Sequence, residues 1–406
     1  MALENAKHTD NLPMSGIRVL DLATFIAAPY AASILGEFGA DVIKIELPGV
    51  GDPLRNFGTP CAEDGSLCWL TEARNKRSIT LLLSNERGAK IFRKLVRSAD
   101  VICENFRPGT LEKWGLGFDE LLKINPNLIM LSISGFGQNG PMKDLPGFAR
   151  VAHAFGGLTH LTGESDGPPL TPGSTSLGDY LTGLNGAVGI LMALRARDRV
   201  GGQRIDLALY ESCFRVLDDL APTYAMNGTI RGRQGIGTGN ACPHGHFETS
   251  DRKWISLACS SDKMFKRYCQ MINREDLSRP DKFGTVSARL ANKHQVDEVV
   301  AEWAMSMSAK DLLAACVEYD VPCALVNTIE DIFSDPQFSE RSNLITLPTE
   351  SGNTFTVPNT IPKLSKTAGA IQSLGPMLGG SNVEVYCGEL GVSESEFEIL
   401  KKQKVI

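Results

Sequence analysis

Asp179 is the residue whose surroundings first suggest covalent chemistry. It follows a Gly- and Ser-rich turn that begins at Pro172, and it opens an apolar stretch that continues to Leu194. A carboxylate can act as a nucleophile toward an acyl group. Asp is also a preferred residue at helix N-caps, where it only accepts hydrogen bonds from free backbone N–H groups. The pattern alone leaves both interpretations open, and capping is the more common of the two.

Cys242, His244 and His246 have the residue types of a metal site. They provide three ligands even if all the side chains share one face, whereas structural zinc sites use closed sets of four. The spacing places no fourth ligand nearby. We therefore expect no metal in this protein.

Basic residues stand beside predicted strands in two groups, which are Arg74, Lys76 and Arg77, and Arg107 with Lys113. Guanidinium and ammonium groups near strand ends suit phosphate oxygens. Such groups also occur on ordinary solvated surfaces. The residues alone support two interpretations equally, a binding site for a phosphorylated ligand and a solvated surface without a ligand.

A glycine pattern of the G-x-G-x-x-G type runs from Gly135 to Gly140, directly after a predicted strand. In dinucleotide-binding proteins this pattern opens a helix whose N-terminus holds the pyrophosphate. Here Pro141 and Pro146 follow at once, and no amphipathic helix begins. We therefore expect no NAD or FAD binding through this motif.

Charge and cysteine content exclude several classes of protein. The 41 Lys and Arg residues against 47 Asp and Glu give a net charge of -6 without a long run of one sign, so no nucleic-acid partner is indicated. The 10 cysteines form no C-x-x-C pair, which is typical of reduced thiols in a cytoplasmic protein. No uninterrupted apolar run approaches the roughly 20 residues of a membrane span. We expect a cytoplasmic protein without a membrane partner.

Short apolar runs alternate with helical spacing in the first part of the chain. Because these runs are apolar on both faces, they predict a parallel sheet covered by helices, which is an α/β fold. The predicted strands are 17–22, 41–46, 78–83, 100–103, 128–134 and, at the end of the first domain, 204–210. Ligands of such folds bind outside the carboxyl ends of the strands. We expect a site in the segments that follow, which are 23–29, 48–55, 104–109 and 135–147.

The length of 406 residues predicts about two domains. We expect a disordered tail at 1–14, a large domain at 15–221, a smaller α/β domain at 222–345 and a return to the large domain at 346–406.

Gly183, Gly186 and Gly189 recur at every third position of the helix after Asp179. Each costs the helix about 1 kcal/mol relative to Ala. Close approach of another backbone, from this chain or from a second subunit, would offset that cost.

Several segments resemble the class III coenzyme A transferases, the family of formyl-CoA transferase and carnitine CoA-transferase. The most specific are ENFRPGTLEKWGLG, which begins at Glu104, and the D-Y-x-x-G block at Asp179. Others in the family's order are GIRVLDL, AAPYAASILGEFGADVIKIELPGVGDPLR, NKRSITLLL, SGFGQNGP, GGQRIDLALYESC and YDVPCALVNTIEDIFSDPQF. The resemblance covers most of the chain.

The resemblance implies a fold and an assembly. Members of this family are ring-shaped, interlocked homodimers, in which each chain has a Rossmann-like large domain built from both termini and a small domain between them. This assembly would explain the glycine-lined helix. An unlike partner chain is the alternative, because some members work as paired unlike chains.

The resemblance also implies roles for individual residues. The family's nucleophilic aspartate falls on Asp179. CoA binding is expected at Thr24, Phe25, Ala27, Asn105, Arg107 and Lys113, together with Arg74 from the basic groups. A glycine-rich loop that closes over the reacting carboxyl falls on 235–240, with Gly237, Gly239 and Asn240 as candidate substrate contacts. The CoA thioester is a substrate, and no metal or redox cofactor is needed.

Two departures from the family pattern affect the expected ligands. Where many members read P-G-Y-D, this chain reads P-G-F-A from Pro146, followed by Arg150 and, one turn on, His153. We hypothesise that Arg150, with His153, pairs with the second carboxylate of a dicarboxylic acid; the alternative is that Arg150 points to solvent. Leu47 stands where many members have Arg or Lys, which puts one adenosine-phosphate contact in doubt.

Three functions follow. The first is transfer of CoA from succinyl-CoA to a dicarboxylic acid (malate, citramalate, itaconate, mesaconate or a substituted succinate) through an aspartyl anhydride and an aspartyl-CoA thioester. The second is a 2-methylacyl-CoA racemase of the same fold, but racemases use the histidine of a G-H-D segment, and this chain has Gly147-Phe148-Ala149 there. The third is a subunit of a hetero-oligomeric CoA-transferase.

Overall fold

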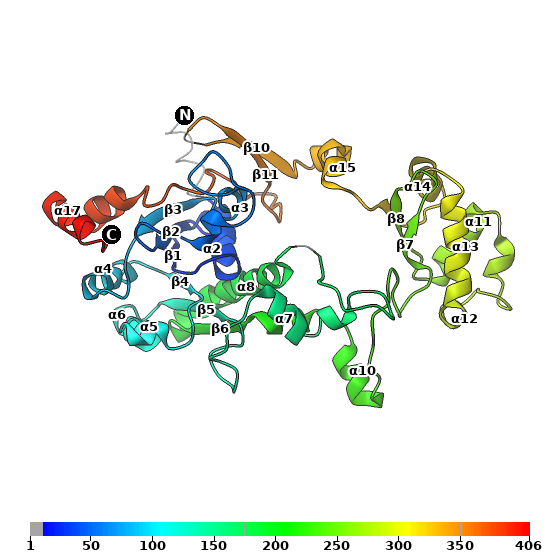
Figure 1. Cartoon of the computed structure of the whole chain (residues 1–406), viewed down its shortest axis with the longest axis horizontal. Helices are drawn as coiled ribbons and strands as arrows, with labels where there is room; N and C mark the ends of the chain where they lie inside the picture. The colour runs from blue at the N-terminus through cyan, green and yellow to red at the C-terminus, as the bar shows by residue number, and fades with distance from the viewer. Residues whose placement is uncertain (1–10, 174, 350) are drawn as a thin grey trace. The chain divides into compact units, whose positions relative to one another are not determined.

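A computed structural model describes residues 11–173, 175–349 and 351–406 (Figure 1). The chain forms two compact units, of which unit 1 holds the described residues up to 158, 171–221 and 339–406, and unit 2 holds 159–170 and 222–338. The boundary after Ala221 coincides with the expected one. Residues 159–170, which we expected in the large domain, belong to unit 2, where the Gly235 N–H donates to the Gly163 carbonyl at 3.0 Å. The chain returns to unit 1 at Ser339, earlier than the expected position 346.

Unit 1 is built on a six-stranded sheet in the order β3-β2-β1-β4-β5-β6, with every neighbouring pair parallel. The strands are β1 (Arg18–Asp21), β2 (Asp41–Glu46), β3 (Lys76–Thr80), β4 (Val101–Glu104), β5 (Ile129–Ser134) and β6 (Arg204–Ala208). This is the strand order of a Rossmann-like doubly wound fold, and the order reverses between β1 and β4. The expected α/β fold with a parallel sheet is therefore confirmed; β2 has the predicted bounds, and the other strands differ from theirs by one to a few residues.

Helices cover both faces of this sheet because successive strand residues point to opposite sides. Val19, for example, faces a cluster with α2 (Ala27–Glu37) and α8 (Leu177–Val200), whereas Leu20 faces a cluster with α4 (Glu86–Val96) and α17 (Glu394–Lys402). The first face carries α2 (Ala27–Glu37), α7 (Ala149–Phe155), α8 (Leu177–Val200) and α9 (Leu209–Arg215). The second carries α4 (Glu86–Val96), α5 (Thr110–Lys113), α6 (Phe118–Ile124), the π-helix η4 (Glu384–Glu389) and α17 (Glu394–Lys402).

The glycines of α8 allow close packing within this chain. A Cβ on Gly183 would lie 2.6 Å from the Ala27 carbonyl oxygen, and one on Gly186 would lie 2.9 Å from the Leu131 side chain. The α2 and α8 helices therefore pack closely (Figure 1). The α8 helix is long and apolar enough to cross a membrane, but core helices of other proteins also meet this criterion. Its glycine face packs against other parts of this chain, as in a core helix.

The remaining elements complete the two units. Unit 1 also contains η1 (Pro53–Asn56), α3 (Leu67–Glu72) and the antiparallel hairpin of β10 (Leu344–Pro348) and β11 (Thr354–Pro358). Unit 2 holds η2 (Thr159–Leu161) and an antiparallel sheet of β7 (His244–Glu248), β8 (Trp254–Ala258) and β9 (Cys323–Leu325). Its helices are α11 (Asp262–Met271), η3 (Glu275–Ser278), α12 (Val286–Ala291), α13 (Lys293–Met305), α14 (Ala309–Glu318) and α15 (Ile329–Ser334). Two helices, α10 (Leu220–Asn227) and α16 (Pro336–Glu340), contain the boundaries after Ala221 and after Phe338.

Candidate active site

A cavity of about 230 Å³ opens at the carboxyl ends of β1, β4 and β5. It is lined by residues at and after these strand ends, by Leu209 of α9 and by one residue of α8, which is Asp179. Six of the residues expected to bind CoA or react with it meet here, namely Thr24, Phe25, Ala27, Asn105, Arg107 and Asp179. They come from three separate segments of the chain, so the fold assembles them at the edge where ligands of doubly wound sheets bind.

The Asp179 side chain has no partner among the residues that the structure describes. It lies in the first turn of α8 rather than at the N-cap, which is Ser176, so the capping interpretation is wrong. Burial raises the pKa of Asp179 to about 6. Above that pH the cavity holds an ionised carboxylate that nothing described in the protein neutralises, which suits a nucleophile.

Both sequence neighbours of Asp179 are anchored. The Gly178 N–H donates to His153 Nε2 at 2.7 Å, and the Tyr180 hydroxyl donates to Glu72 Oε1 at 3.0 Å. Gly178 lets the imidazole approach, because a Cβ there would lie 3.0 Å from the His153 ring. The start of α8 is therefore fixed on each side of the free carboxylate.

His153 does not have the role that we expected from the sequence. Its side chain is buried, 1% exposed, and it does not line the cavity. Burial and the nearby Arg150 charge lower the pKa of His153, which keeps Nε2 free to accept the Gly178 hydrogen bond. His153 thus holds the helix that carries Asp179, and the expectation that it contacts substrate is corrected.

Besides Arg107, the cavity wall contains a second cation, a lysine that the sequence reasoning missed. Lys143 lines the cavity with Asp179, and it lies in the segment 135–147 that was expected to contribute to the site. Arg150 is exposed on α7 and does not itself line the cavity, although Phe148 just before it does. A search for cations in each strand-end segment would have found Lys143.

Two of the expected CoA-binding residues lie outside the cavity wall. Arg74 is 8% exposed, pairs with Glu37 at 2.7 Å and donates to the Pro358 carbonyl at 2.6 Å. Its guanidinium is used inside the fold, so we withdraw Arg74 from the CoA-binding set. Lys113 is exposed at the end of α5 and does not line the cavity.

The glycine-rich loop belongs to unit 2. Gly237 lies on a bridge to Gly245, and a Cβ on it would lie 2.7 Å from Lys293 Nζ. Gly239 and Asn240 follow in the same loop, and their substrate contacts stay a prediction. Among the described residues, no group of three or more His, Cys, Asp or Glu side chains could hold a metal ion.

A second cavity, of about 380 Å³, adjoins the first at the ends of β1, β2 and β3. Thr24 and Phe106 line both cavities. Phe106 and Trp114 meet edge to face, with their ring centroids 5.4 Å apart, and both line the second cavity. A long ligand can therefore occupy the two cavities in sequence.

Comparison with known proteins decides the family. The model of CoA-transferase family III matches residues 14–382. The chain belongs to CoA-transferase family III. The succinyl-CoA--L-malate CoA-transferase beta subunit of Chloroflexus aurantiacus is 50% identical over 401 residues, which is 98% of this chain and 99% of the relative. The alpha subunit of the same name, also from Chloroflexus aurantiacus, is 46% identical over 98% of this chain and 93% of the relative.

A solved structure agrees with this assignment. A CAIB/BAIF family protein from Brucella suis superimposes with a TM-score of 0.82 at 33% identity, covering 93% of this chain and 99% of that one. The resemblance to class III CoA-transferases is therefore confirmed, and this CoA-transferase is an enzyme of the transferase class. The interlocked dimer stays a prediction.

The pKa of Asp179 has a consequence for stability. Because burial raises it to about 6 from 3.8, ionising Asp179 costs stability progressively as the pH rises through that interval. Asp179→Asn removes the buried charge and is expected to raise the free energy of unfolding at pH 7.5 by about 2 kcal/mol. The gain should shrink toward pH 4.5, as followed by urea unfolding at several pH values.

Asp198→Asn is the matched control, because Asp198 is exposed near the other end of the same helix. It should show no such pH-dependent gain. An Asp179→Asn gain that is equal at pH 4.5 and 7.5 would contradict the burial argument.

His153 provides a second test. His153→Ala leaves the buried Gly178 N–H without an acceptor, and we expect it to lower the free energy of unfolding by about 1–3 kcal/mol. His153→Gln keeps an acceptor oxygen on a side chain of similar reach, and it should lower the free energy of unfolding by less than His153→Ala does. Urea unfolding measures both variants, and equal losses would show that the Gly178 hydrogen bond is not what His153 contributes.

Proposed function

We propose that this family III CoA-transferase moves CoA from succinyl-CoA to a dicarboxylic acid of the malate type, with Asp179 as the nucleophile. The observation that carries the proposal is a partly buried carboxylate, without a partner among the described residues, in the strand-end cavity of a chain of this family. The two Chloroflexus relatives, which are named for transfer between succinyl-CoA and L-malate, support the choice of donor and acceptor.

The proposed chemistry is a series of acyl exchanges. The Asp179 carboxylate attacks the thioester carbonyl, which expels CoA thiolate and leaves a mixed anhydride of succinate and Asp179. The thiolate then attacks the Asp179 carbonyl of the anhydride, releases succinate and forms an aspartyl-CoA thioester. The acceptor carboxylate attacks this thioester to form a second anhydride, and the thiolate attacks the acceptor's acyl carbon to give the new acyl-CoA and free Asp179. Every bond broken and formed belongs to the substrates or to Asp179, so we propose that no metal or redox cofactor takes part.

The cavity supplies what these steps need. Each attack develops negative charge on a tetrahedral oxygen, which backbone N–H donors stabilise. Ile26 and Ala27 line the cavity where α2 begins, and the first N–H groups of a helix have no partner within it. We propose that this helix start binds the developing charge.

The CoA moiety is proposed to run from one cavity into the other. Arg107 and Lys143 line the same cavity as Asp179 and offer exposed cations for the CoA phosphates. The aromatic second cavity, with Phe106 and Trp114, suits the adenine ring. Lys113, just before Trp114, stays a candidate for a phosphate contact.

The second carboxylate of the acceptor needs a cation of its own. Arg150 remains our candidate because it is an exposed guanidinium two residues from the cavity-lining Phe148, and guanidinium binds carboxylates with two parallel hydrogen bonds. Lys143 is the competing candidate because it lines the cavity itself.

We further propose that the protein is a cytoplasmic homodimer or pairs with an unlike chain. The subunit names of the two relatives support a partner. Leu184, Val188, Leu191 and Met192 of α8 are 44–66% exposed, which is the kind of apolar surface that a partner covers. The 10 cysteines, all free, support a reducing compartment.

The proposal is tested by incubating the purified chain with succinyl-CoA and single dicarboxylic acids, with CoA esters followed by mass spectrometry. We expect L-malate or a close C4–C5 analogue to accept CoA, and Asp179→Ala to lower the rate about a thousandfold or more. Exchange that appears only after an unlike chain is added would identify a hetero-oligomer. Deuterium entering the α-carbon of a 2-methylacyl-CoA, with no exchange, would identify a racemase and contradict the proposal.

Paired variants separate the two candidate cations. Arg150→Ala is expected to raise the KM for the dicarboxylate about tenfold and to leave the KM for succinyl-CoA within about twofold. Lys143→Ala is expected to raise the KM for succinyl-CoA. An Arg150→Ala variant with an unchanged KM for the dicarboxylate would refute the role of Arg150.

A further inference from the structure

The three-residue loop Ala23–Phe25, between β1 and α2, is held by side chains on almost every backbone polar group. The Ala23 N–H donates to Asp21 Oδ1 at 3.1 Å, and its carbonyl accepts from Lys44 Nζ. The Thr24 N–H and carbonyl both bond the Asn105 amide, at 2.9 and 2.8 Å. The Phe25 N–H donates to Asp52 Oδ1 at 3.0 Å. These N–H groups are therefore occupied and cannot bind the developing charge of a thioester.

Phe25 needs this restraint because its backbone is strained. Its φ of 61° lies in the left-handed region, which a bulky side chain rarely adopts. Such a residue costs on the order of 1–3 kcal/mol and persists only where its surroundings fix it. In this conformation the Phe25 ring contacts Phe57 and Phe148 edge to face, with centroids 6.3 and 6.0 Å away, and Phe25 lines the cavity that also contains Asp179.

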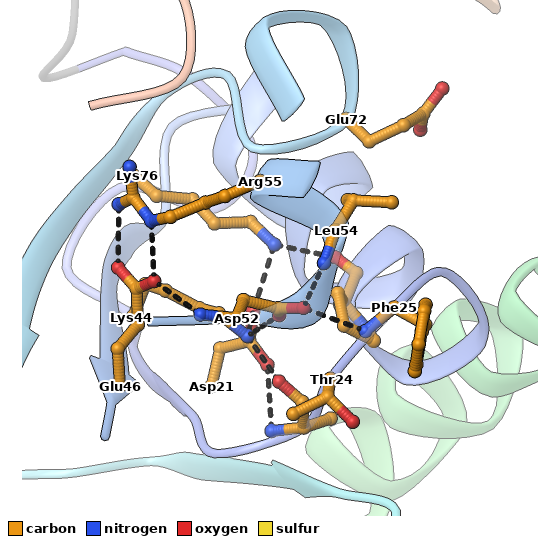
Figure 2. Close-up of polar contacts among 12 residues, drawn as sticks. Asp21, Thr24, Phe25, Lys44, Glu46, Asp52, Leu54, Arg55, Glu72 and Lys76 are labelled. Atoms are coloured by element: carbon orange, nitrogen blue, oxygen red, sulfur yellow. Dashed lines mark hydrogen bonds and ion pairs between the residues drawn. The ribbon is translucent and has the colours of Figure 1, made fainter. Parts of the chain in front are cut away.

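Asp52 is the residue that joins the strained loop to the sheet. It lies after β2, caps η1 through the Leu54 N–H at 2.9 Å, and its Oδ2 pairs with Lys44 Nζ at 2.8 Å (Figure 2). Both side chains of this pair are 1% exposed, although the residues border the second cavity. Burial opposes the charge on Asp52, but the Lys44 ammonium and the two backbone N–H donors outweigh it and hold the pKa of Asp52 below its usual value.

The surrounding charges fix Asp52 in turn. Its own N–H donates to Glu46 Oε2 at 2.9 Å, and Glu46 is paired with Arg55 at 2.8 Å. Asp21, which holds Ala23, is paired with Lys76 at 2.8 Å (Figure 2). The desolvation of these buried charges offsets much of their mutual attraction, so the network adds little stability. Any other geometry would leave a buried charge unpaired, and the network therefore favours a single arrangement of the loop.

We propose that Asp52 is a positioning residue of this CoA-transferase, which with Lys44 locks Phe25 in its left-handed conformation and so sets the wall against which the CoA thioester lies. The inference rests on the proposed function for its kinetic readout. Its binding readout needs only that the protein binds CoA. Asp52 acts through Phe25 and does not touch the reacting atoms.

The test uses four proteins: the wild type, Asp52→Asn, the double variant Asp52→Asn with Lys44→Gln, and Glu37→Gln. In Asp52→Asn an amide NH2 group can face the Lys44 ammonium, so the lock weakens. In the double variant the side-chain carbonyl introduced at position 44 accepts from the amide introduced at position 52. The NH2 group at position 44 then donates to the Ala23 carbonyl, and no unpaired charge remains. Glu37→Gln breaks the buried Glu37–Arg74 pair, which contacts neither the loop nor Asp52, and is the matched control.

We expect Asp52→Asn to raise the Kd for CoA, from calorimetry, and the KM for succinyl-CoA by about tenfold. The KM for the acceptor should stay within about twofold, and amide exchange in the peptide that contains residues 23–25 should quicken. The double variant should restore most of the CoA affinity and most of the protection of the loop from amide exchange. Glu37→Gln should lower the Tm and leave the Kd for CoA and the loop exchange unchanged.

The proposal is overturned if Asp52→Asn lowers the Tm as Glu37→Gln does but leaves CoA binding and loop exchange unchanged. If Asp52→Asn fails to fold, the double variant tests the proposal instead. A folded double variant with a tenfold weaker affinity for CoA would refute the role of Asp52 in fixing Phe25. A wild type that binds CoA but exchanges none contradicts the proposed function instead, and the binding and exchange results still decide the role of Asp52.

Discussion

The buried ion pair between Lys44 and Asp52 is the interaction on which the geometry of the site depends. It fixes the loop from Ala23 to Phe25 and thereby the place where α2 begins. The α2 helix then contacts α8 so closely that a Cβ on Gly183 would lie 2.6 Å from the Ala27 carbonyl oxygen. Because α8 carries Asp179, the proposed nucleophile, the positions of both the cavity wall and this carboxylate depend on the same pair of charges.

Asp179 itself is the exception within this network. Carboxylates at the neighbouring strand ends are hydrogen-bonded or paired, as Glu104 is with the Phe106 N–H at 2.9 Å and Asp21 is with Lys76. Asp179 has no such partner among the described residues, and burial raises its pKa to about 6. Its backbone is nevertheless well anchored, through His153 and through the Tyr180 hydroxyl on Glu72. A fixed backbone with a free, desolvated carboxylate is the arrangement that a nucleophile in acyl transfer requires.

The sequence was most informative where local pattern decides the structure. Apolar runs such as 41–46 predicted the strands, and the parallel sheet followed, so the strand-end segments that form the cavity could be named in advance. The local pattern left Asp179 open to interpretation as a helix cap, and only the family resemblance implied that it is a nucleophile. The sequence could not show that Arg74 is unavailable to CoA. Its pairing with Glu37, which lies 37 residues away, depends on tertiary contacts that no local pattern reveals. Lys44 could have been suspected, because a charged residue inside an otherwise apolar strand needs a buried partner.

The central claim is that Asp179 carries the acyl group and then CoA. The most direct measurement is to incubate the enzyme with succinyl-CoA alone, add hydroxylamine, digest the protein and locate modified residues by mass spectrometry. The account predicts a hydroxamate on Asp179 that depends on succinyl-CoA and is absent when CoA alone is used. A hydroxamate on a different residue, or an unmodified Asp179 in an enzyme that exchanges CoA under the same conditions, would contradict it.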